Sequence, residues 1–201
     1  MTDLNSCGRS FFFLLLLATL AGLSATALAQ VESARSSLTV HVYKTGLLSS
    51  LGHNHVVTAP LAESKVDASR MLVEIMVRAK DLRVIDPEDS ESARAEIQAT
   101  MLGSKVLDAD RYPEIRFKSS RIEPAGAGRY HVTGILELHG TRKEIGFDVA
   151  GGPGRYRGNV KLNQTDFGIQ PVSSLAGAVK VKNQVEIDLD VYQNPAPTAR
   201  R

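Results

Sequence analysis

Apolar residues alternate with polar residues along most of this chain, and this period of two constrains the fold more than any other feature of the sequence. Successive side chains of an extended strand point to opposite faces, so each alternating run predicts a strand with one apolar face. The pattern therefore predicts a mainly β protein. The alternating runs span 37–44, 71–78, 114–119, 130–138, 143–149, 155–163 and 179–191.

Turn-forming residues separate these runs. The segments 123–128 (EPAGAG) and 151–154 (GGPG) supply residues that tolerate positive φ, and 139–141 (HGT) connects two runs directly. Runs joined so closely are expected to form antiparallel hairpins. A closed antiparallel barrel of about eight such strands leaves no exposed edge and can hold one small ligand inside.

One segment departs from the period of two and predicts a helix over 87–102. Asp86 is a candidate N-cap and Pro87 a candidate first helical residue. Apolar residues then recur every four positions at Ala93, Ile97 and Met101, and Gly103 is a candidate stop. This inserted helix is expected to pack its apolar stripe on the sheet or to cover one end of the barrel.

The first 29 residues predict a cleaved signal peptide. Arg9 precedes an unbroken apolar run over 11–17, and Ala27-Leu28-Ala29 fits the small-x-small pattern of a cleavage site. A membrane anchor is the less favoured alternative, since small residues dilute the end of the apolar segment. Export to the periplasm or the outside of the cell is therefore expected, with Gln30 as the new N-terminus.

The remainder is expected to form a single domain over 30–192 and a disordered tail over 193–201. Cys7 is the only cysteine and leaves with the signal peptide, so no disulfide is expected. The formal net charge of +2 is too small to indicate a nucleic-acid partner.

The candidate functional residues are concentrated in Gly52-His53-Asn54-His55, which places two histidines two positions apart. On a strand, His53 and His55 point to the same side, where both could bind one metal ion, with His41 or His139 as a third ligand. The competing interpretation is a pair of half-buried histidines that bond the backbone or line a pocket. Nucleophile and phosphate-loop patterns are absent from the sequence, which predicts no catalytic residues and a protein that is not an enzyme.

Three stretches, taken in order, resemble the YceI-like family. Residues 105–117 contain YPEIRF and resemble the point where a helix of that family ends and a strand begins. Residues 132–143 resemble its H-G hairpin, and 166–169 resemble its late D-F-G-I. The order and spacing agree from about Leu38 to Tyr192. The resemblance implies a bacterial periplasmic protein with a closed eight-stranded antiparallel lipocalin-like barrel, which holds a polyisoprenoid, an isoprenoid quinone or a fatty amide.

The chain is therefore expected to bind or carry a long apolar, lipid-like molecule in the barrel lumen, where each buried methylene contributes about 0.8 kcal/mol. His53 and His55 are expected at the mouth, where an imidazole can hydrogen-bond the polar head of the ligand. The apolar residues expected to line the lumen share the apolar phase of their strands: Val40, Val42, Val73, Ile75, Val77, Ile115, Phe117, Leu136, Phe147, Val160, Leu162, Val185, Ile187 and Leu189.

Two other functions stay open at this point. One is a metal-binding protein or metalloenzyme that uses His53 and His55, and the other is a structural module whose core is filled by its own side chains. The expected partner is an apolar small molecule, with no dedicated cofactor or structural metal and no nucleic acid. Transient contact with membrane enzymes and a homodimer are also open.

Overall fold

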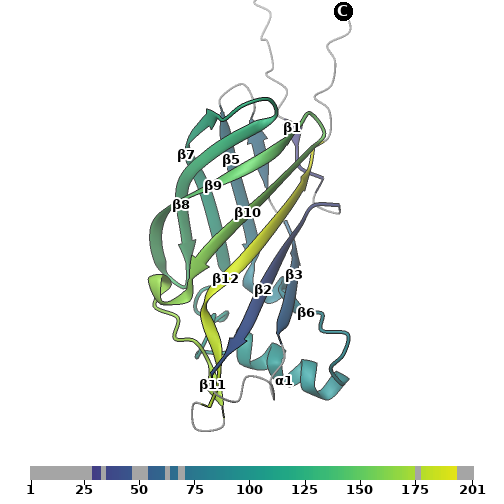
Figure 1. Ribbon diagram of the computed structural model, residues 1–201, viewed down its shortest axis with the longest axis vertical. Helices are drawn as coiled ribbons and strands as arrows, with labels where there is room; N and C mark the ends of the chain where they lie inside the picture. Colours follow the sequence, from purple (N-terminus) through teal and green to yellow (C-terminus); the bar gives the residue numbers. More distant parts are fainter. Residues whose placement is uncertain are drawn as a thin grey trace, which may run out of the picture.

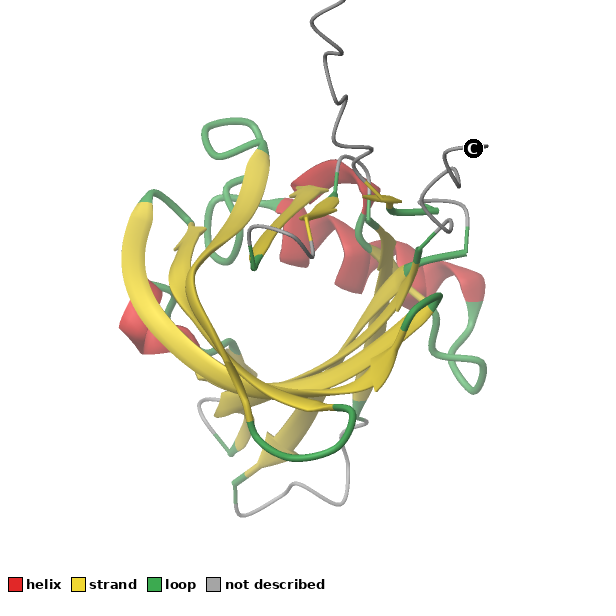
Figure 2. Cartoon of the chain, turned by 90° about the horizontal axis from the view of Figure 1, so that it is seen from above, coloured by secondary structure: helices red, strands yellow, loops and turns green. Residues whose placement is uncertain are grey.

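The computed structural model describes residues 29–32, 35–46, 54–61, 64–67, 71–174 and 178–193. Its strands form one antiparallel sheet that curls strongly around an interior, with a helix across one end (Figures 1 and 2). None of the helices in these ranges is long and apolar enough to cross a membrane. The strands are β1 (Ala29–Gln30), β2 (Ser37–Thr45), β3 (His55–Pro60), β4 (Lys65–Asp67), β5 (Leu72–Arg78), β6 (Arg83–Val84), β7 (Glu114–Pro124), β8 (Arg129–Leu138), β9 (Thr141–Gly152), β10 (Arg155–Asn163), β11 (Ser173–Ser174) and β12 (Val179–Tyr192).

The hydrogen-bonded order is β1-β4-β5-β7-β8-β9-β10-β12-β2-β3-β6, with β11 paired to β12. The strands of six residues or more are consecutive in that order, from β5 to β3. The predicted mainly β architecture and the antiparallel hairpins are confirmed. The closed eight-stranded barrel is not what the ladders show, because the sheet has 12 strands and no ladder in the described ranges joins β3 to β5.

The seam between β3 and β5 is spanned by side chains and by short segments. After β5, the 3-10 turn η2 (Ala79–Asp81) leads into β6, which pairs with β3. Val57, Val77 and Leu82 belong to one buried cluster across this seam. Pro60 ends β3 and has no N–H to donate, which is typical of an edge strand. The sheet is therefore strongly curled, and no ladder in the described ranges joins its two ends.

The helix α1 spans Glu91–Leu102 and has Ser90 as its N-cap, with the Ser90 hydroxyl accepting the Ala93 N–H. The predicted start at Asp86-Pro87 is wrong by four residues, because the Asp86 carboxylate bonds β3 instead of capping a helix. Gly103 is confirmed as the C-terminal boundary. The Gln98 side chain docks the helix on β6 by accepting the Val84 N–H and donating to the Leu82 carbonyl.

The outer face of β2, β12 and β10 carries a row of paired carboxylates. Asn159 and His41 both bond Asp188, and Arg155 bonds both oxygens of Asp190. The Asn159 hydrogen bond is the main cause that lowers the pKa of Asp188, and the Arg155 hydrogen bond is the main cause that lowers the pKa of Asp190. These charged pairs therefore tie three adjacent strands together in the ionised state.

Acid is expected to destabilise the protein by protonating the carboxylates of this row. A carboxyl whose pKa is lower in the folded than in the unfolded state stabilises the fold above its unfolded pKa, and that contribution is lost as pH falls below about 5. Asp190→Asn should therefore lose less stability than the parent between about pH 7 and about pH 3. Urea unfolding at both pH values measures this difference. Glu144→Gln, which alters an exposed carboxylate on β9, is the matched control and should keep the parent's dependence. Equal acid sensitivity of Asp190→Asn and the parent would contradict the assignment.

Candidate functional site

The interior of the curled sheet holds two cavities. The first, of about 180 Å³, is lined almost entirely by apolar side chains and reaches toward α1, where Met101 lines it. The second, of about 200 Å³, lies between the other ends of the strands, near Tyr130 and Tyr156. Well-packed interiors contain few voids larger than a water molecule, so cavities of this size indicate a lumen that its own side chains do not fill.

The structure places the predicted lining residues on the inner face of the sheet. All of the apolar residues predicted to line the lumen border the first cavity except Val73, which borders the second. Their role in ligand binding stays a prediction. The aromatic rim of the second cavity was not predicted, although Tyr156 lies in phase with Val160 and Leu162 on β10. Counting tyrosine with the apolar residues would have identified it.

Residues from the three stretches that resemble the YceI-like family meet beneath the first cavity. The Tyr112 and His139 rings pack edge to face with centroids 4.8 Å apart. His139 Nδ1 donates to the carbonyl of Phe167, 3.2 Å away, and the Phe167 side chain is only 1% exposed and lines the cavity. Gly140 has φ 72°, and a Cβ there would lie 2.5 Å from the Tyr112 ring. Residues of all three stretches therefore pack together at one side of the first cavity, and we call this group the floor of the cavity.

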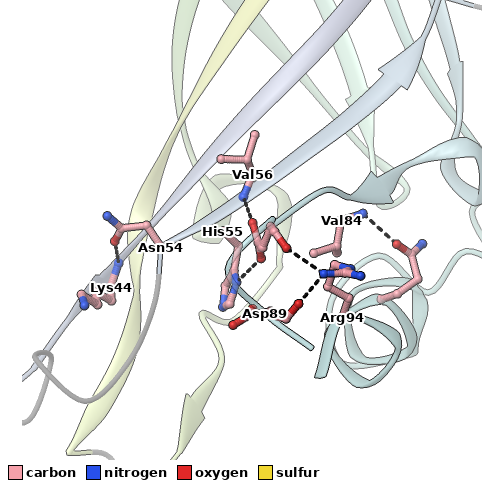
Figure 3. A network of polar contacts seen from close by, with 9 residues as sticks. Lys44, Asn54, His55, Val56, Val84, Asp89 and Arg94 are labelled. Carbon is pink, nitrogen blue, oxygen red and sulfur yellow. Dashed lines mark hydrogen bonds and ion pairs between the residues drawn. The ribbon is translucent and has the colours of Figure 1, made fainter. Parts of the chain in front are cut away.

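His55 is held by a buried carboxylate (Figure 3). Its Nδ1 lies 2.7 Å from Asp86 Oδ2, while Asp86 Oδ1 accepts the Val56 N–H at 2.6 Å. Asp86 is only 5% exposed, and Arg94 donates to its main-chain carbonyl at 3.1 Å. Because an ionised carboxylate only accepts hydrogen bonds, Nδ1 carries the proton, and Nε2 of a neutral His55 is left as an acceptor.

The structure tests only part of the histidine prediction. His55 lies in phase with Val57, which lines the first cavity, but it is not itself among the residues that border either cavity. His53 lies outside the described residues. The proposed third ligands do not approach His55: His41 bonds Asp188 on the outer face, and His139 packs on Tyr112. That part of the metal hypothesis is wrong: His41 pairs with Val56, so it faces the side of the sheet opposite to His55, and His139 is held by the Phe167 carbonyl.

A different set of side chains does gather at His55. Ligand atoms of His55, Asp86 and Asp89 all lie within 4.8 Å of one another. One imidazole and two carboxylates can bind a divalent cation such as Zn²⁺. Two of the three groups already share a hydrogen bond, so a metal ion would have to displace it or bind at His55 Nε2.

A strongly curled antiparallel sheet around an apolar interior defines the class of fold. Within that class the chain belongs to the YceI-like family, since the YceI-like domain matches residues 30–192.

Relatives support this assignment. The chain is 32% identical to a UPF0312 protein of Vibrio parahaemolyticus over 113 residues, which cover 51% of this chain and 59% of that protein. It is 29% identical to a UPF0312 protein of Pseudomonas putida over 105 residues, which cover 47% of this chain and 55% of that protein. The chain thus spans less than two thirds of the length of the curated relatives it matches.

Solved structures share the fold. BcnA of Burkholderia cenocepacia superposes with a TM-score of 0.56 at 18% identity, covering 80% of this chain and 98% of BcnA. A mutant of the Campylobacter jejuni YceI protein gives a TM-score of 0.50 at 14% identity, covering 65% of this chain and 78% of that one. At these identities the similarity concerns the fold alone.

Proposed function

We propose that this protein is a binding or carrier protein, not an enzyme, which holds an apolar, lipid-like ligand in its lumen. The first cavity is the observation that carries this proposal, because apolar side chains from many strands surround it and leave it unfilled. A structural module with a filled core would close such a space by side-chain packing. Apolar surface of this kind binds a hydrocarbon chain without specific polar contacts.

The ligand class implied by the family is a polyisoprenoid, an isoprenoid quinone or a fatty amide. The predicted signal peptide favours action in the periplasm or outside the cell, where a carrier shields an insoluble chain from water. Residues 1–28 lie outside the described ranges, and β1 begins at Ala29. Transfer of the ligand to and from membrane enzymes and assembly into a homodimer belong to the same proposal.

Prenol binding tests the proposal directly. Native mass spectrometry of the purified protein should show a co-purified apolar molecule, and a prenol such as farnesol should displace an apolar fluorescent probe. Val185 lines the first cavity, so Val185→Phe should fill it and weaken prenol binding by at least about tenfold. Ile85 is 47% exposed and lies outside both cavities, so Ile85→Phe is the control and should bind as the parent does. An empty protein that takes up no prenol, quinone or fatty amide would refute carriage.

We propose in addition that His55 orients the polar head of the ligand. Asp86 fixes the imidazole and leaves Nε2 to accept from a hydroxyl, a contact worth about 1 kcal/mol. His55→Phe, alone or with His53→Phe, should therefore reduce the preference for a prenol over the matching hydrocarbon by roughly fivefold. Competition binding of the two probes measures the ratio. An unchanged ratio would contradict the head-group role.

The cluster of His55, Asp86 and Asp89 favours a metal-binding function as the second candidate. Isothermal titration with Zn²⁺ separates the two candidates. Stoichiometric binding by the parent that is lost in Asp89→Asn, together with unchanged prenol selectivity in His55→Phe, would favour the metal site.

A further inference from the structure

The two cavities share three lining side chains. Ile75 on β5, Phe147 on β9 and Leu189 on β12 border both cavities. No two of these strands are neighbours in the order of the sheet, so their side chains approach the lumen from different directions. Ile75, Phe147 and Leu189 therefore lie where the two cavities adjoin, and we call this set the septum and the two cavities the chambers.

Packing holds the phenyl ring of the septum in place. Phe147 is 8% exposed, and its ring packs on that of Phe117 with centroids 5.3 Å apart. A glycine on the neighbouring strand makes room for the Phe117 ring. A Cβ at Gly134 would lie 2.6 Å from Phe117 Cζ, closer than side-chain carbons approach one another. The Phe117 ring therefore occupies space that a larger residue at position 134 would take, and it supports the Phe147 ring from one side.

We propose that Phe147 is a specificity-determining residue, which stops an apolar chain at the boundary between the chambers and so limits the length of chain that the lumen accepts. This inference rests on the proposed function and adds its ligand selectivity. The first chamber, of about 180 Å³, is only slightly larger than an apolar cavity of about 150 Å³ that admits benzene. The lumen therefore takes a short apolar group or the end of a longer chain, whose remainder stays outside.

A series of prenols measures the length limit. Geraniol, farnesol and geranylgeraniol add one isoprene unit at each step, and their affinities follow from displacement of one fluorescent probe. In the parent, affinity should stop rising once the chain fills the first chamber. In Phe147→Ala the chambers join, so the longest prenol should bind at least about tenfold more tightly than in the parent, the gain from burying roughly two more methylene groups.

Two further variants provide a matched control and a test that does not depend on the folding of Phe147→Ala. Leu162 borders only the first chamber, so Leu162→Ala removes a similarly buried side chain without joining the chambers and should strengthen binding of the longest prenol by less than Phe147→Ala does. Val149 borders only the second chamber, so Val149→Phe should leave the binding of every prenol unchanged. Loss of the longest prenol in Val149→Phe, or affinity that rises through the whole series in the parent, would overturn the proposal.

Xenon binding separates this proposal from the proposed function, because xenon enters dry apolar cavities whether or not a lipid binds. Xenon-pressurised crystals of the parent should show two separate sites, one on each side of the Phe147 ring. One continuous site in the parent would refute the septum even if prenols bind. Two sites in a protein that binds no prenol would leave the septum standing and refute lipid carriage.

Discussion

Replacement of Phe167 by alanine is expected to lower the free energy of unfolding by about 3–5 kcal/mol, the usual cost of removing a buried phenyl ring. The Phe167 side chain is only 1% exposed and lies in the floor of the first cavity. The space left by the ring would add to the cavity that it borders, and this space cannot close without moving several strands. Urea unfolding followed by circular dichroism measures the loss.

Two controls define the cause of that effect. Phe167→Leu keeps most of the apolar volume and should cost less than half as much. Ile85→Ala removes an exposed apolar side chain, 47% accessible, and should change stability by no more than about 0.5 kcal/mol. If Phe167→Ala costs no more than Ile85→Ala, the floor beneath the cavity is not a structural support.

Asp86→Ala should cost about 2–4 kcal/mol, the second largest effect among these variants. The substitution leaves the Val56 N–H and the His55 Nδ1–H without their acceptor, and hydrogen bonds to a charged group are worth about 1.5–3 kcal/mol each. Because Asp86 is 5% exposed, water does not readily take the place of its carboxylate. Urea unfolding again gives the change.

Asp86→Asn separates loss of the charge from loss of the side chain. The amide oxygen can still accept the Val56 N–H, but the amide nitrogen donates, so His55 must move its proton from Nδ1 to Nε2. Nitrogen chemical shifts of the His55 ring report that change. Asp81→Ala, at a carboxylate whose side chain is 37% exposed, is the matched control and should change stability by less than about 1 kcal/mol. Equal losses for Asp86→Ala and Asp81→Ala would show that the buried contacts contribute nothing.

The period of two was enough to predict the inward-facing side chains of the long strands. Val40 and Val42 alternate with polar neighbours, and their pairing with Ile187 and Val185 keeps the same phase across two strands. Strand β3 was not predicted, because HVVTAP does not alternate. The strands β1, β4 and β6 have two or three residues each, too few to show any period.

Other features depend on contacts that no local pattern contains. An aspartate before a proline is equally suited to cap a helix or to accept bonds from a distant strand, and only the fold brings Asp86 to Val56. The proposed division of the lumen depends on Ile75, Phe147 and Leu189, which lie on three separate strands and come together only in the fold. In the sequence, Phe147 is one more apolar residue in phase.

The pairing of β2 with β12 has a consequence for the timing of folding. The ladder joins Leu38 to Leu189, so two strands at opposite ends of the chain are neighbours in the middle of the sheet. Until β12 is available, β2 and β10 both present unpaired edges, and no strand joins the hairpins on the two sides of β12. Contacts between residues this far apart in sequence slow folding to roughly milliseconds or seconds. A chain that is synthesised from its N-terminus therefore completes its fold only after its last strand is available, and its unpaired strand edges are exposed to aggregation in the meantime.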